Sequence, residues 1–257
     1  MRRDPTKGRP APGSADWSKI VTDVTHPTPP LKGAPHLADP IRVTVFVVAW
    51  LALAGVLIGV GDLVVHTGGI QRFDVHVTSV VVAHRSPALD RAMKAVTWLG
   101  SWVALVVTAG VVLLLVLRRR LPVGFLLLAL AVWGGTQGGT TLAKNVVQRP
   151  RPPEHLRLVS AHGWSWPSGH TTTATLVFAV LAVLVWILRP GAGPRLLAAL
   201  ASCIAIAAVA FSRVELGVHW STDVFASMLF VAAWLVVAGL LYGSLLTRGS
   251  RDRPVTV

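Results

Sequence analysis

Residues 43–65, VTVFVVAWLALAGVLIGVGDLVV, decide the fold class. Within this stretch the only charged side chain is that of Asp62. A helix needs roughly 20 mostly apolar residues to cross about 30 Å of hydrocarbon. The stretch therefore predicts a membrane-spanning helix, and it is too long for the apolar part of a cleavable signal, so we expect it to be kept as the first span.

Five further apolar runs of this kind follow along the chain. They cover residues 96–117, 121–143, 171–188, 196–211 and 224–246. A chain of 257 residues that is 53% hydrophobic and 14% charged, with a mean hydropathy of +0.62, is not an ordinary soluble domain. We predict an all-α integral membrane bundle of six transmembrane helices, embedded in the lipid bilayer.

The basic residues indicate how the bundle is oriented. A net charge of +13 raises the possibility of nucleic-acid binding, but the cations lie at the ends of the apolar runs and not on one soluble module, so we expect no nucleic-acid partner. Most of them are found in the first 42 residues, at 118–120, at Arg189 and Arg195, and near the C-terminus. The positive-inside rule places these segments in the cytoplasm of a cell-membrane protein, with both termini inside. This bias is weakened without being reversed by four cations after the first span, Arg72, Arg85, Arg91 and Lys94.

We expect three parts along the chain. Residues 1–42 are rich in Pro and charge and lack apolar periodicity, which is typical of a disordered tail. Residues 43–246 form the six-span domain, and 247–257 a short basic tail. Between the first two spans, residues 68–95 predict a short interfacial helix in which no motif with a chemical meaning can be recognised.

Three polar stretches fall on the same predicted face. Residues 144–152 (KNVVQRPRP) leave the third span, 167–170 (PSGH) enter the fourth, and 212–223 (SRVELGVHWSTD) connect the fifth to the sixth. The basic segments assigned to the cytoplasm do not include these motifs, and the resulting orientation puts all three stretches outside. We therefore expect one active site at the extracytoplasmic interface.

His219 and Asp223 are the candidates for nucleophile and orienting carboxylate. Four residues apart, they would share one face of a helix, so that the carboxylate holds one ring nitrogen and leaves the other free. A satisfied interfacial histidine is the structural alternative.

The PSGH stretch predicts the start of a helix. Its free N–H groups can bind an anion, although Ser168 could equally be a simple cap. His170, next to Gly169, could protonate a leaving oxygen.

Three cations from three span ends complete the candidate site. Read singly, Lys144, Arg151 and Arg213 would be anchors at the membrane surface, but their convergence indicates a phosphate. We interpret Arg149 and Arg157 as anchors at the membrane surface. If the substrate is a diphosphate, they would be the extra cations for its second phosphate.

The pattern K-x6-RP, PSGH and SR-x5-H-x3-D resembles the type 2 phosphatidic acid phosphatase superfamily, also called the lipid phosphate phosphatase and haloperoxidase superfamily. The resemblance covers residues 43–246. It implies a hydrolase without metal or other cofactor, in which His219 forms a phosphohistidine, Asp223 orients it and His170 is the acid. The phosphate oxygens would then be held by Lys144, Arg151, Ser168, Gly169 and Arg213.

A lipid phosphate or diphosphate is the expected substrate, because a site at the interface meets head groups most easily. Phosphatidic acid, phosphatidylglycerol phosphate and polyprenyl diphosphate all fit. A phosphotransferase on the same scaffold and a non-enzymatic lipid-phosphate binding or transport protein stay open as alternatives. Haloperoxidase chemistry is disfavoured by the six apolar spans, and a zinc site by the cations beside the histidines.

Overall fold

The computed structural model describes residues 40–251, and in this range the chain forms helices and no strand. The predicted tails at 1–42 and 247–257 lie largely outside the described residues. The elements are α2 (Pro40–His66), α3 (Gly68–Ala83), α4 (Pro87–Val96), the 3-10 turn η2 (Thr97–Gly100), α5 (Trp102–Leu117), α6 (Val123–Val147), the 3-10 turn η3 (Glu154–Leu156), α7 (Gly169–Leu188), α8 (Ala192–Glu215) and α9 (Ser221–Arg251).

Five of these helices, α2, α6, α7, α8 and α9, are long and apolar enough to cross a membrane. The all-α membrane bundle is therefore confirmed. The predicted second span is different: instead of one run over 96–117, the segments Pro87–Gly100 and Trp102–Leu117 meet at a bend of 43°, and they make a sixth span only if taken together. The predicted fifth span, the shortest by sequence, is extended at both ends.

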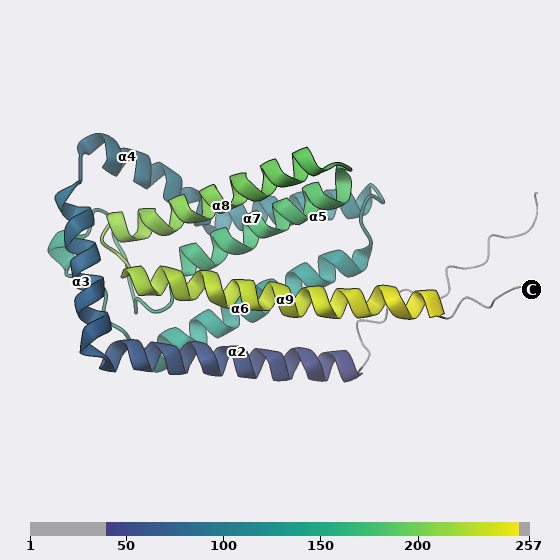
Figure 1. The fold of residues 1–257 in the computed structure, drawn as a ribbon, viewed down its shortest axis with the longest axis horizontal. Helices are drawn as coiled ribbons and strands as arrows, with labels where there is room; N and C mark the ends of the chain where they lie inside the picture. The colour runs from purple at the N-terminus through teal and green to yellow at the C-terminus, as the bar shows by residue number, and fades with distance from the viewer. Residues whose placement is uncertain (1–39, 252–257) are drawn as a thin grey trace, which may run out of the picture. The chain divides into compact units, whose positions relative to one another are not determined.

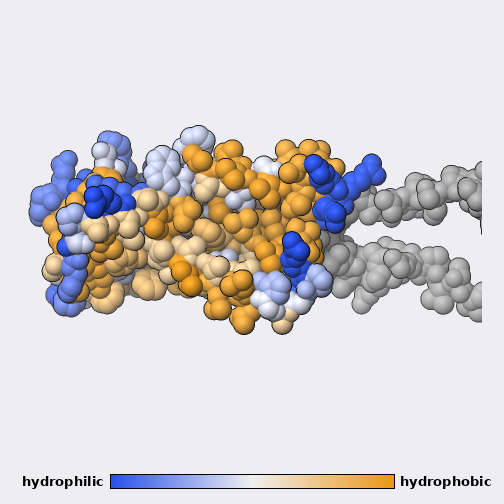
Figure 2. All heavy atoms as spheres, turned by 90° about the horizontal axis from the view of Figure 1, so that it is seen from above, coloured by the Kyte–Doolittle hydropathy of each residue, from blue (hydrophilic) through white to orange (hydrophobic). Residues whose placement is uncertain are grey.

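The spanning helices run alongside one another, and α3 lies across them at one end (Figure 1). The space-filling view shows apolar surface between two hydrophilic ends (Figure 2). Helix α7 packs against α5, α6, α8 and α9 and is the centre of the bundle. Most large apolar side chains on the outer helices are exposed, as expected of surfaces that face lipid tails.

The first two turns of α7 are buried although they are rich in threonine. Thr172 Oγ1 donates to the Ser168 carbonyl at 3.0 Å, and Thr175 Oγ1 donates to the Thr171 carbonyl at 2.8 Å. These bonds to the preceding turn satisfy hydroxyls that would otherwise be buried without a partner. Gly100 packs directly against this turn, because a Cβ there would lie 2.5 Å from the His170 carbonyl oxygen.

The segment between the first two spans forms two helices, where the sequence predicted one. Ser86 caps α4 by accepting from the Leu89 N–H, and Pro87 begins the helix. Helix α3 is held to the bundle by Val77 and Val81, which pack on a cluster contributed by α8 and α9. The buried residues of α3 are both polar, Asp74 and Thr78.

Candidate active site

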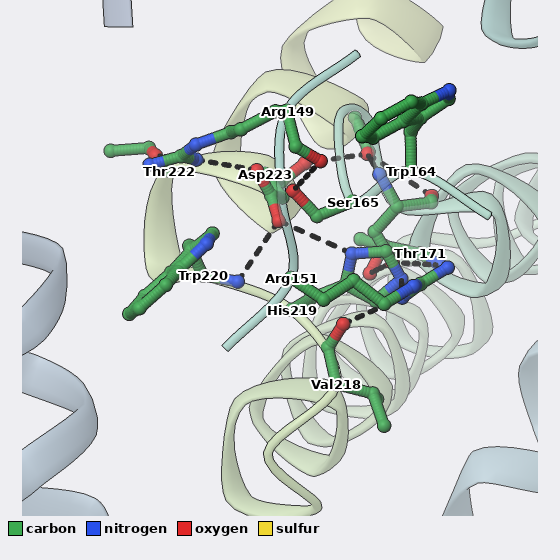
Figure 3. Close-up of polar contacts among 12 residues, drawn as sticks. Arg149, Arg151, Trp164, Ser165, Thr171, Val218, His219, Trp220, Thr222 and Asp223 are labelled. Atoms are coloured by element: carbon green, nitrogen blue, oxygen red, sulfur yellow. Dashed lines mark hydrogen bonds and ion pairs between the residues drawn. The ribbon is translucent and has the colours of Figure 1, made fainter. Parts of the chain in front are cut away.

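The three polar stretches meet at the end of the bundle where α6 and α8 finish and α7 and α9 begin. Figure 3 shows Arg149 and Arg151 of the first stretch beside His219 and Asp223 of the third. Lys144 is in the last turn of α6 and Arg213 in the last turn of α8. Asp223 is in the first turn of α9. The chain thus brings all three motifs to one place, as the sequence predicted.

His219 and Asp223 are in contact, but not in the way that their spacing predicted. His219 precedes α9, so the pair does not share a helical face. The contact forms because the turn folds back: the Asp223 N–H donates to the Trp220 carbonyl at 3.1 Å, and Asp223 Oδ2 accepts from the Trp220 N–H at 2.9 Å. The same oxygen lies 3.2 Å from His219 Nδ1. His219 is 2% exposed and Asp223 is fully buried.

The other ring nitrogen of His219 faces Arg151. Arg151 Nη1 lies 3.1 Å from His219 Nε2. A guanidinium can only donate, so Nε2 is the acceptor and Nδ1 carries the hydrogen that Asp223 receives. Burial lowers the pKa of His219 from 6.5 to about 3; the Asp223 hydrogen bond and charge oppose this shift, and the charges of Arg151 and Lys144 add to it. The ring is therefore neutral at neutral pH, with a free electron pair on Nε2.

Arg151 is fixed by backbone carbonyls as well as by the histidine. Nη1 donates to the Val218 carbonyl at 2.6 Å, Nε to Gly163 at 2.9 Å and Nη2 to His162 at 3.0 Å. Burial lowers the pKa of Arg151, and the charge of Asp223 opposes this effect. The carbonyls of the loop before α7 thus hold the Arg151 guanidinium in a position where Nη1 faces His219 Nε2.

Lys144 and Arg213 complete the cation cluster. Lys144 Nζ donates to the Trp164 carbonyl at 2.8 Å, and Arg213 Nη1 donates to Thr97 Oγ1 at 2.6 Å. Arg213 Nε is buried and has no hydrogen-bond partner among the residues that the structure describes. His170 lies close enough to Arg213, Arg151 and Lys144 to interact electrostatically with all three. The three cations lie close enough for their charges to act on one another, and such a cluster is suited to an anion.

Ser168 is the N-cap of α7, and its hydroxyl oxygen accepts hydrogen bonds from the first turn of the helix. Its Oγ accepts from the Thr171 N–H at 3.4 Å and from Thr171 Oγ1 at 3.0 Å. Both bonds are accepted by Ser168 Oγ, and the side chain is fully buried. The first N–H groups of α7, beginning at Gly169, have no partner within the helix, so the cap and the anion site are compatible.

Arg149 is not a membrane anchor, and here the sequence prediction was wrong. The side chain is 4% exposed. Nη1 lies 2.5 Å from Asp223 Oδ1, and Nη2 lies 2.6 Å from Asp74 Oδ2. Arg149 therefore belongs to the site through the carboxylate that holds His219. Arg157, by contrast, donates to the Pro152 carbonyl at 2.9 Å and stays in the loop.

Asp74 was missed altogether, because its segment carries no recognisable motif. The available signal was weak: an acidic residue on the same helical face as Val77 and Val81, where a purely apolar stripe would be expected. Within residues 40–251, no three His, Cys, Asp or Glu side chains are gathered as metal ligands.

A helical membrane protein that gathers cations, two imidazoles and a carboxylate at one end of its bundle has the equipment of a phosphoryl-transfer enzyme. Comparison with known proteins is in agreement. The model of the PAP2 superfamily matches residues 122–246. Phosphatidylglycerophosphatase B of Bacillus subtilis (strain 168) is 32% identical over 165 residues, which are 62% of this chain and 78% of that protein.

A solved structure supports the same conclusion. The crystal structure of the first transmembrane PAP2 type phosphatidylglycerolphosphate phosphatase from Bacillus subtilis superposes with a TM-score of 0.62 at 26% sequence identity, covering 83% of this chain and 98% of that chain. The chain belongs to the PAP2 superfamily, and it is a membrane phosphatase.

Proposed function

We propose that this protein removes a phosphate from a membrane lipid through a phosphohistidine on His219 Nε2, without a metal ion. The observation that carries the proposal is the environment of this ring: Nδ1 is held by Asp223 at 3.2 Å, and Nε2 faces Arg151 at 3.1 Å. The imidazole is thereby fixed in one tautomer with its electron pair directed at a cation that could bind phosphate.

In the first step, Nε2 attacks phosphorus and the bond from phosphorus to the lipid oxygen breaks. His170, protonated beside the negatively charged phosphate of the bound lipid, gives its proton to that oxygen, so the lipid leaves as an alcohol. Lys144, Arg151 and Arg213 hold the phosphoryl oxygens, whose charge is what this kind of transition state needs stabilised. Asp223 balances the positive charge that develops on the His219 ring.

In the second step, water attacks the phosphorus of the phosphohistidine. Neutral His170 takes the proton of that water, the bond between nitrogen and phosphorus breaks, and inorganic phosphate leaves. His219 and His170 are then in the states in which they began. We expect each histidine to act on one side of the phosphorus, with His219 supplied by the loop before α9 and His170 by the first turn of α7.

A lipid monophosphate is a better candidate than a diphosphate. Arg149, one of two extra cations considered for a second phosphate, is engaged by the Asp74 and Asp223 carboxylates. Arg157 is bonded to its own loop. Both relatives named above act, by their names, on phosphatidylglycerol phosphate, and this lipid is our first choice of substrate.

We also propose that the site faces outside the cell. The exposed arginines 118–120 lie between α5 and α6, at the end of α6 opposite Lys144. If that turn is cytoplasmic by the positive-inside rule, the site is at the outer surface. Lipid head groups would then reach it from the outer leaflet.

The test is phosphate release by the purified protein in detergent with EDTA. Phosphatidylglycerol phosphate, phosphatidic acid, polyprenyl diphosphate and a soluble sugar phosphate would be compared at equal concentration. We expect release that EDTA leaves unchanged and that is fastest with phosphatidylglycerol phosphate. Loss of release on chelation, with recovery on adding a divalent cation, would contradict the metal-independent mechanism, and a preference for the sugar phosphate would contradict the lipid assignment.

A further inference from the structure

Behind the His219 and Asp223 pair, the protein buries a second ionic contact. Arg149 lies between two carboxylates, Asp223 from α9 and Asp74 from α3. The exposed fractions of the three residues are 4%, 0% and 1%. Charges removed from water in this way are costly unless each is paired and fully hydrogen-bonded, so the contact needs an explanation.

Asp74 is bonded through both of its oxygens. Oδ1 accepts from Ser221 Oγ at 2.5 Å and from the Thr222 N–H at 2.9 Å. Oδ2 accepts from Arg149 Nη2 and from Thr222 Oγ1, each at 2.6 Å. Ser221 and Thr222 begin α9, so Asp74 acts as a cap supplied by another helix, at the end where negative charge is stabilising.

The loop side of the contact is equally fixed. Arg149 Nη1 also donates to Thr222 Oγ1 at 2.8 Å, and the Arg149 carbonyl accepts from the Ser165 N–H at 2.9 Å. The guanidinium lies 5.7 Å from the ring of Trp220. Figure 3 shows Arg149 and Thr222 on the side of Asp223 away from His219. These bonds connect Arg149 to α3, to the start of α9 and to the loop before α7, the segments that surround His219.

We propose that Asp74 and Arg149 are positioning residues for the phosphoryl transfer: Asp74 holds Arg149, and Arg149 holds Asp223 Oδ1 so that Oδ2 faces the His219 ring. This inference rests on the function proposed above. Neither residue touches the substrate. Both act through Asp223: Asp74 from α3, an element that carries none of the three motifs, and Arg149 from the loop that follows α6.

The charges explain why two carboxylates are needed. His219 is faced by Asp223 from α9, by Lys144 from α6 and by Arg151 from the following loop. Without Asp74, the charge of Arg149 would neutralise that of Asp223. Asp223 would then stabilise less well the positive charge that develops on the His219 ring. Asp74 neutralises the charge of Arg149, so the negative charge of Asp223 remains available to stabilise the His219 ring.

Removing each member should then have a different effect. Asp74→Asn keeps the shape of the side chain but leaves Arg149 with Asp223 as its only carboxylate partner. Arg149→Gln leaves two buried carboxylates without a cation, which is the more serious defect. In the double variant only one buried carboxylate, that of Asp223, is left without Arg149, so this variant should be more active than Arg149→Gln alone.

The experiment measures kcat and KM for phosphate release from phosphatidylglycerol phosphate in detergent micelles. We expect Asp74→Asn to lower kcat about 10- to 100-fold, the range seen when the outer partners of catalytic metal ligands are removed, with KM within about twofold of the wild type. The matched control is Asp62→Asn, the same change on an exposed side chain of α2, which should leave both constants unchanged.

The separation of kcat from KM, and the partial recovery in the double variant, are the readouts that a merely structural role would not produce. All variants would be compared as monodisperse protein with their melting temperatures recorded. If Asp74→Asn does not accumulate as folded protein, Arg149→Lys gives the same test, because it keeps a charge but lacks the fork that reaches two carboxylates. Arg149→Lys should likewise have a lower kcat and an unchanged KM.

Wild-type kcat in Asp74→Asn, an effect on KM alone, or a double variant that is worse than Arg149→Gln would overturn the inference. Its failure can be told from that of the proposed function by including His219→Ala. An inactive His219→Ala beside a fully active Asp74→Asn removes only the positioning role. An active His219→Ala removes the phosphohistidine mechanism itself.

Discussion

Arg151 Nη1 and His219 Nε2 are 3.1 Å apart, so the nitrogen that attacks phosphorus in the proposed mechanism is covered by a cation. In that mechanism the guanidinium gives up this contact when substrate binds, and a phosphoryl oxygen replaces the ring nitrogen as its partner. The rest of Arg151 is held by the carbonyls of Val218, Gly163 and His162. A small shift would therefore change the partner of Nη1 without releasing the side chain.

The Arg151→Lys substitution tests this double role. Lysine keeps the charge but cannot bond three carbonyls and a phosphate in one plane. We expect kcat to fall about 10²- to 10³-fold, as when one donor to a transition-state oxyanion is removed. Steady-state phosphate release measures the effect, with Arg118→Lys at the exposed turn as the control. Equal activity of Arg151→Lys and the wild type would show that charge alone is enough.

Gly100→Ala tests whether the turn before α5 positions His170. The added Cβ would lie 2.5 Å from the His170 carbonyl oxygen, so the backbone at the start of α7 must move. A displacement near 1 Å can cost about 100-fold in rate, and we expect a loss of that order in kcat. Gly110→Ala on α5, where a Cβ meets nothing within 4 Å, is the control. Similar activity of the two variants would contradict the positioning.

The pKa of His219 predicts how stability depends on pH. Because burial lowers this pKa from 6.5 to about 3, the unfolded chain binds a proton between these values that the folded protein does not. The free energy of unfolding therefore falls as pH drops through this window. Thermal unfolding in detergent between pH 7 and 5 should show a smaller decline for His219→Gln than for the wild type, because the two proteins share every other titrating group. Parallel curves would mean that His219 is protonated as easily in the folded state as in the unfolded state.

Orientation can be tested by labelling single cysteines in intact cells. Cys203 is exposed and is first replaced by serine. Ser160→Cys in the loop before α7 should react with an impermeant thiol reagent added outside, and Arg120→Cys between α5 and α6 should not. Both positions are exposed, and both avoid the positive φ angles of Gly163 and Arg119. The opposite labelling pattern would place the site in the cytoplasm.

The bundle and the motif residues could be predicted from the sequence because each signal is local. An apolar run of sufficient length predicts a span by itself, and charges at its ends predict its direction. Ser168 as a helix cap and His219 beside Asp223 were likewise accessible from short spacings. The bend between Gly100 and Trp102 was not, because an apolar run looks the same whether its helix is straight or broken.

The support of the site could not be predicted for a different reason. Asp74 and Arg149 are 75 positions apart, and Thr97 and Arg213 are 116 apart. Their contacts depend on how α3 and the turn before α5 pack onto the bundle. An arginine at the end of a span has the same sequence signature whether it faces head groups or a buried carboxylate, which is why Arg149 was misread.

The most direct test of the central claim is to trap the phosphorylated enzyme. Wild-type protein would be mixed with lipid substrate labelled with ³²P in its terminal phosphate and quenched in alkali within milliseconds. Phosphohistidine would be recognised as label that survives alkali and is lost in acid. We predict stoichiometric labelling of the wild type, with the label on the peptide that contains His219, and none in His219→Ala. An active enzyme that never carries label, or label that persists in His219→Ala, would contradict the account.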